Sequence, residues 1–282
     1  MSEPRTRWIV RIILVLAVIV FFGVSMIPII EALNKPVSEQ KQSNVQSQSK
    51  LEDEARGLEL VLQREPENQA ALKSLLQIRL LLLRQNKTDM RSVIEPLEKL
   101  AKLNPGNTQY TVLLAQAKLG IGDKEGAAAA YRSILQTKPG DIKALQGMVA
   151  LLLQEKRPQA AIGLLQETLY STAPKANKIQ PGSVDAIAVQ VLLGNVYASE
   201  KRYNQALTVY DQAIKSDAQD FRPVLAKAML FKKQGKTNEA QPLFNKAALL
   251  APTQYKDEIN KAASEPTTPT SPASSPDSTP KK

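Results

Sequence analysis

The chain contains no cysteine and no histidine among its 282 residues. Without cysteine there is no disulfide, no thiol nucleophile and no iron–sulfur ligation, and without histidine the commonest general base and metal ligand are missing. The acidic residues at 52–54 and 123–125 fall on expected turns and polar helix faces, where no cleft holds a substrate beside them. We therefore expect a protein that is not an enzyme and that binds neither a metal nor a cofactor.

Glycine and tryptophan are also scarce, with 12 residues and one residue respectively. No segment shows the convincing run of alternating apolar and polar residues that a half-buried strand requires. The glycine-rich stretch GIGDKEG at 120–126 has no strand before it and the spacing GxGxxxG, so we interpret it as a turn and not as a phosphate-binding loop. Long stretches rich in Leu, Ala, Gln and Lys instead predict an all-α protein.

Acidic residues are outnumbered, and the formal net charge is +10. Such an excess can attract nucleic acid or an anionic membrane surface. The basic residues are scattered, however, with acids between them in nearly every segment, and they form no dense stripe with aromatic residues. We therefore expect no nucleic-acid partner.

One long apolar run lies near the N-terminus. Ile12 to Ile30 comprises 19 residues without a charge, which at ~1.5 Å per residue gives about 28 Å, close to the hydrocarbon thickness of a bilayer. Trp8 stands at one end, where interfacial aromatics are common. We interpret residues 8–30 as an uncleaved transmembrane anchor within an N-terminal segment 1–33. A cleaved signal peptide is the alternative, but its apolar core would be shorter and no clear A-x-A site follows.

The orientation of this anchor is only weakly encoded. Arg5, Arg7 and Arg11 precede the apolar run, and Lys35 and Lys41 follow it with acids nearby. The bias slightly favours a cytoplasmic N-terminus, which would place the bulk of the chain on the other side of the membrane. Both orientations stay open at this point.

Two polar segments flank the part that can fold. Residues 34–50 are polar and aperiodic, and we expect a flexible linker there. Residues 264–282 are rich in Ser, Thr and Pro and cannot bury an apolar core, so we expect a disordered tail. The folded domain is therefore expected within residues 51–263.

A period of 34 residues runs through this domain. Gly194 and Ala228 are 34 residues apart, and small residues and aromatic residues recur at the same spacing on either side of them. Small residues are expected where two helices approach closely, and the large rings are expected to fill the space between those contacts. The predicted packing residues are Gly194, Tyr197, Ala206, Tyr210, Ala213, Ala228, Phe231, Ala240, Phe244 and Ala247.

This pattern resembles the tetratricopeptide repeat (TPR), a helix–turn–helix unit of 34 residues. The resemblance is strong over 187–252 and covers roughly 51–252, with an insertion at 171–184. It implies a superhelix of antiparallel helix pairs, A and B, that binds other proteins. The predicted fold is an all-α TPR superhelical solenoid with one N-terminal transmembrane helix. Its expected parts are a half-unit at 51–66, units near 67–106, 107–141, 142–173, 183–220 and 221–252, and a capping helix at 253–263.

The A helices of TPR proteins line a concave groove. In the present register their outward positions carry amides and cations but no acid. Lysine and arginine could pair with carboxylates of a partner while Gln and Asn bond its backbone, and a merely solvated helix face is the alternative. The predicted groove residues are Lys73, Gln77, Gln109, Gln116, Lys143, Gln146, Asn195, Arg222 and Lys232.

Some TPR proteins clamp a C-terminal carboxylate with Lys, Asn and Arg at set groove positions. Lys73 and Lys143 match two of these positions. Gln77, Leu113 and Gly147 stand where Asn, Asn and Arg would be needed. The resemblance therefore does not extend to this type of clamp.

The arrangement of anchor, linker, repeats and Ser/Pro-rich tail resembles cyanobacterial membrane-anchored TPR proteins of the Pitt type. This resemblance implies a scaffold at the thylakoid or plasma membrane. Its implied partner is light-dependent protochlorophyllide oxidoreductase, or a related factor of chlorophyll synthesis or photosystem assembly. The alternative is an extracytoplasmic TPR assembly factor for envelope or cytochrome complexes.

The anchor predicts how the chain fractionates. The full chain should stay in the membrane pellet after carbonate extraction, because 19 uncharged residues are long enough to cross the hydrocarbon layer. A variant lacking residues 1–33 should be released as a helical protein. Release of the full chain by carbonate alone would contradict the transmembrane interpretation.

Overall fold

The computed structural model describes residues 43–265, and every regular element in this range is helical. None of the helices in this range is both long and apolar enough to cross a bilayer. The anchor predicted at residues 8–30 and nearly all of the tail predicted at 264–282 lie outside the described residues and stay predictions. The described part divides into two compact units, which meet in sequence between Arg157 and Pro158.

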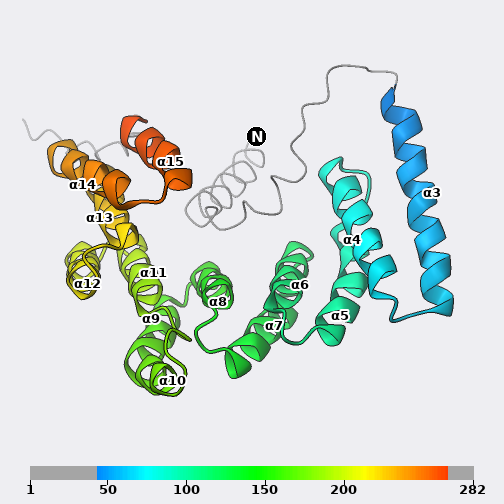
Figure 1. Ribbon diagram of the computed structural model, residues 1–282, viewed down its shortest axis with the longest axis horizontal. Coiled ribbons are helices and arrows are strands. Elements are labelled where there is room, and N and C mark those ends of the chain that lie inside the picture. Colours follow the sequence, from blue (N-terminus) through cyan, green and yellow to red (C-terminus); the bar gives the residue numbers. More distant parts are fainter. Residues whose placement is uncertain (1–42, 266–282) are drawn as a thin grey trace, which may run out of the picture. The chain divides into compact units, whose positions relative to one another are not determined.

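Unit 1 is a row of helices in chain order, in which each helix packs on the next (Figure 1). Its first helix has no preceding partner in the described chain, and a short 3-10 turn leads into the third α-helix. The elements are α3 (Ser43–Arg64), α4 (Gln69–Arg84), η3 (Met90–Val93), α5 (Ile94–Leu103), α6 (Thr108–Gly120), α7 (Lys124–Thr137) and α8 (Ile142–Gln154).

Unit 2 continues the helical pattern. Its tightest pairs are α11 with α12 and α13 with α14, and α15 packs on α14 at the end of the row. The elements are α9 (Pro158–Glu167), η4 (Thr168–Thr172), α10 (Ala173–Ile179), α11 (Ala186–Ser199), α12 (Tyr203–Ser216), α13 (Phe221–Lys233), α14 (Thr237–Leu250) and α15 (Thr253–Ser264).

Two segments differ from the sequence-based expectation. The flexible linker was expected over 34–50, but α3 already begins at Ser43. The insertion at 171–184 was expected between repeat units, and most of it is helical, because η4 and α10 carry the backbone on from α9 as far as Ile179. A helix that packs on only one side can form in a largely polar segment, because it needs only helix propensity and one apolar contact face. The polar composition of these two segments therefore did not predict that they are helical.

The start of each A helix is fixed by a short polar side chain. Asn68, Asn107, Asp141, Asp185 and Asp220 are the N-cap residues of α4, α6, α8, α11 and α13. Each side chain accepts a hydrogen bond from a backbone N–H of the first turn, at 2.8–3.1 Å. Such a cap satisfies a donor that the helix itself cannot pair, so the five A helices begin at equivalent places in the repeat.

The turns from helix A to helix B share one backbone device. Each contains a residue in the left-handed region, namely Asn86, Gly122, Lys156, Lys201 or Gly235, with φ between 56° and 85°. This conformation ends helix A and redirects the chain into helix B. Gly122 therefore belongs to a turn, as predicted, and not to a phosphate-binding loop.

Helices α11 and α12 approach each other closely at Gly194. A Cβ atom built on Gly194 would stand 2.2 Å from Cε1 of Tyr210, and the Tyr210 side chain is only 1% exposed. Ala206 and Ala213 on α12 are fully buried. Only glycine leaves room for the tyrosine ring at this position, so the two side chains specify how closely the helices pack.

The same contact yields a stability prediction. Gly194→Ala should destabilise the protein by ~1–3 kcal/mol, because the added methyl group has to displace a buried ring. Gly163→Ala is the matched control, since Gly163 also lies within a helix but a Cβ atom added there would have nothing within 4 Å; it should stabilise by ~0.5–1 kcal/mol. Thermal unfolding followed by circular dichroism measures both. A gain in stability for Gly194→Ala would contradict this packing.

Candidate protein-binding surface

The predicted groove residues fall on A helices of both units, and the two sets differ in their surroundings. Six lie in unit 1 and are at least partly exposed. Their side chains form no hydrogen bond or ion pair with other residues of the described range. We call this set the A-helix face of unit 1: Lys73 and Gln77 on α4, Gln109 and Gln116 on α6, and Lys143 and Gln146 on α8.

In unit 2, Asn195 has an internal partner. Its Oδ1 accepts a hydrogen bond of 2.7 Å from the hydroxyl of Tyr210. Burial raises the pKa of Tyr210 above its ordinary value, which keeps this hydroxyl a donor throughout the physiological range. Asn195 therefore holds the core tyrosine that packs on Gly194, and its side-chain oxygen is already used.

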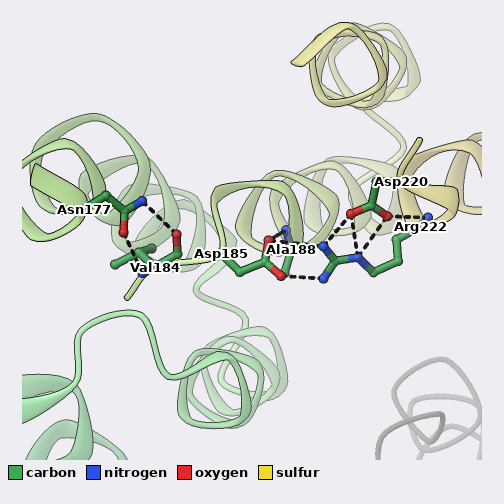
Figure 2. A network of polar contacts seen from close by, with 6 residues as sticks. All are labelled: Asn177, Val184, Asp185, Ala188, Asp220 and Arg222. Atoms are coloured by element: carbon green, nitrogen blue, oxygen red, sulfur yellow. Dashed lines mark hydrogen bonds and ion pairs between the residues drawn. The ribbon is translucent and has the colours of Figure 1, made fainter. Parts of the chain in front are cut away.

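Arg222 also has internal partners. It lies near the start of α13 and points between two carboxylates (Figure 2). Its guanidinium reaches Asp220 at 2.5 Å and Asp185 at 2.6 Å. Because these acids are the N-caps of α13 and α11, one arginine links the starting turns of two successive A helices.

The charges in this network stabilise one another. Hydrogen bonds to Asp220 raise the pKa of Arg222 against the effect of burial, and those to Asp185 add to them. Burial acts to raise the pKa of Asp185, but hydrogen bonds from Arg222 and from the backbone N–H of Ala188 outweigh it and leave that pKa lowered. The guanidinium of Arg222 therefore joins two successive repeats, and its charge is largely satisfied within the protein.

Lys232 is engaged at the C-terminal end of α15. Its Nζ donates to the carbonyl oxygen of Ala262 and lies 3.5 Å from that of Ala263. It also lies 5.7 Å from the centroid of the Phe244 ring. A cation there satisfies carbonyls that the last turn leaves unpaired and complements the helix dipole, so Lys232 fastens the capping helix.

Residues outside the predicted set also hold the loop before α11 in place. Asn177 on α10 donates from Nδ2 to the carbonyl of Val184 at 2.9 Å and accepts from its N–H at 2.8 Å (Figure 2). Ser183 donates to the same Oδ1 at 3.1 Å. These bonds fix the loop that leads into α11. No repeat position points to Asn177, because it lies in the insertion.

Gly147 has a structural role that the sequence pattern did not indicate. A Cβ atom at this position on α8 would lie 2.2 Å from Cζ and 2.5 Å from the hydroxyl oxygen of Tyr131 on α7. Tyr131 is 1% exposed, and burial raises its pKa to about 12. The arginine that a carboxylate clamp needs here would collide with the ring, which gives a physical reason for the absence of this clamp.

Comparison with known proteins identifies the repeats. Profiles described as tetratricopeptide repeat match residues 94–142, 187–220 and 223–254. These segments lie in both units and coincide with helix pairs such as α11 with α12 and α13 with α14. These matched segments therefore carry tetratricopeptide repeats, a type of repeat that mediates protein–protein interactions. The prediction of an all-α fold with such repeats is confirmed for the described residues.

Two curated relatives align with the chain. Cellulose synthase operon protein C of Pseudomonas fluorescens (strain SBW25) is 30% identical over 112 residues, which are 38% of this chain and 9% of that protein. The protein SLOW GREEN 1, chloroplastic, of Arabidopsis thaliana is 26% identical over 234 residues, which are 83% of this chain and 68% of that protein. The chain thus spans less than a tenth of the first relative and about two thirds of the second.

Solved TPR structures show a distant likeness. Yeast Tom70 aligns with 74% of this chain and 42% of its own, with a TM-score of 0.49 and 16% identity. A thermophilic TPR protein of Thermus thermophilus aligns with 66% of this chain and 96% of its own, with a TM-score of 0.41 and 21% identity. A likeness at this level concerns the helical repeat alone and says nothing about partners.

The network around Arg222 predicts a pH-dependent contribution to stability. Arg222→Gln should lower the free energy of unfolding by about 1 kcal/mol at pH 7, because two partly exposed carboxylates lose their cation. The pKa of Asp185 is lowered in the folded protein, so its contribution is present above the unfolded-state pKa of about 3.9 and is lost as pH falls through the folded-state value. The difference between wild type and variant should therefore shrink in acid.

Urea unfolding at pH 7 and near pH 3 tests this. Arg56→Gln is the control, because Arg56 pairs with Asp53 at 3.6 Å while both side chains are more than 70% exposed, and little change is expected. A difference for Arg222→Gln that is equally large at both pH values would show that the ion pairs do not stabilise the fold.

Proposed function

We propose that this protein is a membrane-anchored, non-enzymatic TPR scaffold whose A-helix face of unit 1 binds an acidic segment of a partner protein. The observation that carries the proposal is the contrast between the two sets of predicted groove residues. In unit 2, Asn195, Arg222 and Lys232 bond to other parts of the chain. In unit 1 the corresponding side chains have no such partners within residues 43–265, and they are available to a ligand.

The composition of this face favours an anionic, extended ligand. Lys73 and Lys143 supply two ammonium groups on α4 and α8, and the four glutamines lie on the same three A helices. Ammonium groups form charge-assisted hydrogen bonds with carboxylates. Glutamine amides donate and accept at once, so they can pair with the backbone of a peptide whatever its side chains.

We propose light-dependent protochlorophyllide oxidoreductase, or a related factor of chlorophyll synthesis or photosystem assembly, as the partner. The resemblance to Pitt-type proteins suggests this enzyme, and the name of the relative SLOW GREEN 1 places that protein in the chloroplast. The proposed location is the thylakoid or plasma membrane of a cyanobacterium. The proposed anchor at residues 8–30 would hold the repeats beside membrane-bound enzymes.

The alternative is an extracytoplasmic assembly factor for envelope or cytochrome complexes. The observation that favours it is the small excess of Arg residues before the apolar run, which predicts repeats on the far side of the membrane. Protease added to sealed vesicles of known orientation distinguishes the two. Protection of the repeats in vesicles whose cytoplasmic side faces out would favour the extracytoplasmic role.

The proposed face predicts the effect of charge reversal. Lys73→Glu combined with Lys143→Glu should weaken capture of purified protochlorophyllide oxidoreductase by roughly ten-fold, because two attractions of ~0.2–1 kcal/mol each become repulsions. Binding should also fall as salt rises, since exposed charges are screened over about 8–10 Å.

The matched control reverses two cations on B helices of the same unit. Lys102→Glu with Arg132→Glu changes the net charge equally, and both side chains are exposed on α5 and α7. This variant should retain most of the binding. Equal loss in both variants would reduce the effect to net charge, and no loss in either would move the partner site away from this face.

A further inference from the structure

The insertion in unit 2 lengthens a B helix beyond the usual end of the repeat. α9, η4 and α10 follow one another without a break in the helical backbone, and η4 is a π-helical turn. Such wide turns are rare and occur often at functional sites. Pro174 is the second residue after this turn, and a wide turn relieves the clash that its ring would make with the carbonyl four residues earlier. The extension is therefore a built helical element.

Its exposed residues form one continuous stripe. They occur as neighbouring pairs with a spacing of four, while Leu169 and Ala173 on the other side are buried. Tyr170 is 67% exposed and Ile179 is 87% exposed, and Ile179 is the most exposed of the large apolar side chains described. We call this stripe the insertion ridge: Tyr170, Ser171, Pro174, Lys175, Lys178 and Ile179.

The ridge is cationic as well as apolar. Between Thr168 and Val184 the chain has two lysines and no acid. The nearest acids are Glu167, one residue before this stretch, and Asp185, whose carboxylate is held by Arg222. The stretch is therefore positively charged, and its two lysines favour contact with a negatively charged surface.

The ridge is also held in place from within. Asn177 is not part of the stripe and bonds to both backbone groups of Val184 (Figure 2). The loop after α10 therefore fastens the extension to the start of α11. Because the backbone is already ordered, docking of the ridge costs little additional conformational entropy.

We infer that the insertion ridge docks on the surface of an anionic membrane. A projecting row with an isoleucine at its tip, a tyrosine and two lysines fits the interface of a bilayer. There the apolar side chains enter the boundary of the acyl chains, tyrosine lies at headgroup level, and lysines meet lipid phosphates. A protein partner would need a complementary groove, whereas a fluid lipid surface accommodates a protruding side chain. This contact is separate from the A-helix face and gives unit 2 its own ligand.

A single-tryptophan reporter tests the inference in the full chain. Trp8 is the only tryptophan, so Tyr170→Trp is combined with Trp8→Phe. The protein is reconstituted into vesicles of phosphatidylcholine with or without about one third phosphatidylglycerol. Blue-shifted emission and quenching by lipids brominated near the headgroup are expected on anionic vesicles. Adding Lys175→Glu and Lys178→Glu should reduce the membrane-contacting fraction at least about five-fold.

A second reporter gives the matched control. Leu249 is 80% exposed on α14, outside the ridge, so Leu249→Trp with Trp8→Phe should show solvent-exposed emission on the same vesicles. The inference is overturned if the Y170W reporter is not quenched on anionic vesicles, or if the L249W reporter is quenched as strongly. It is also overturned if the Y170W reporter is shielded only after a membrane-protein fraction is added, because a protein then covers the ridge.

Discussion

The fold depends on a close contact between a buried ring and a residue without a side chain. Tyr210 lies against Gly194 within one helix pair, and Tyr131 lies against Gly147 on the following A helix. Both rings are 1% exposed. Because interiors are packed almost without voids, a methyl group at either glycine displaces the ring and with it the neighbouring helix. In the last repeat Ala228 and Phe244, both buried, occupy the corresponding positions.

Polar side chains then decide how one repeat meets the next. Asp185 and Asp220 cap their own helices and also share Arg222. In unit 1, Thr108 donates to the cap residue Asp141 at 2.6 Å, which again joins the starting turns of successive A helices. Each link uses a groove position or its neighbour for structure, so the repeats cannot all present the same side chains to a ligand.

The repeats themselves were predictable, because alternating small and large residues at a fixed period are visible in the chain. The internal partners of the predicted groove residues could not be predicted in this way. Arg222 and Lys232, like Lys143 and Gln77, lie at predicted outward positions of A helices. Arg222, however, pairs with a carboxylate of the preceding repeat, and Lys232 bonds to the end of α15. The helical insertion was missed for a related reason, since its helix depends on a π turn and on Asn177, neither of which belongs to the repeat pattern.

The net charge of +10 can act on a partner through direct ion pairs or through the long-range electrostatic field. Internal ion pairs affect these two contributions differently. Lys118 and Lys227 lie 3.0 Å and 2.5 Å from Glu98 and Asp211, so they can offer a partner little direct contact. The long-range field of the chain depends on the sum of all charges, and it mainly changes the rate of association. The proposed direct pairing at Lys73 would mainly change the rate of dissociation. A face that recognises an acidic segment must therefore differ from a merely basic surface in how long the complex lasts.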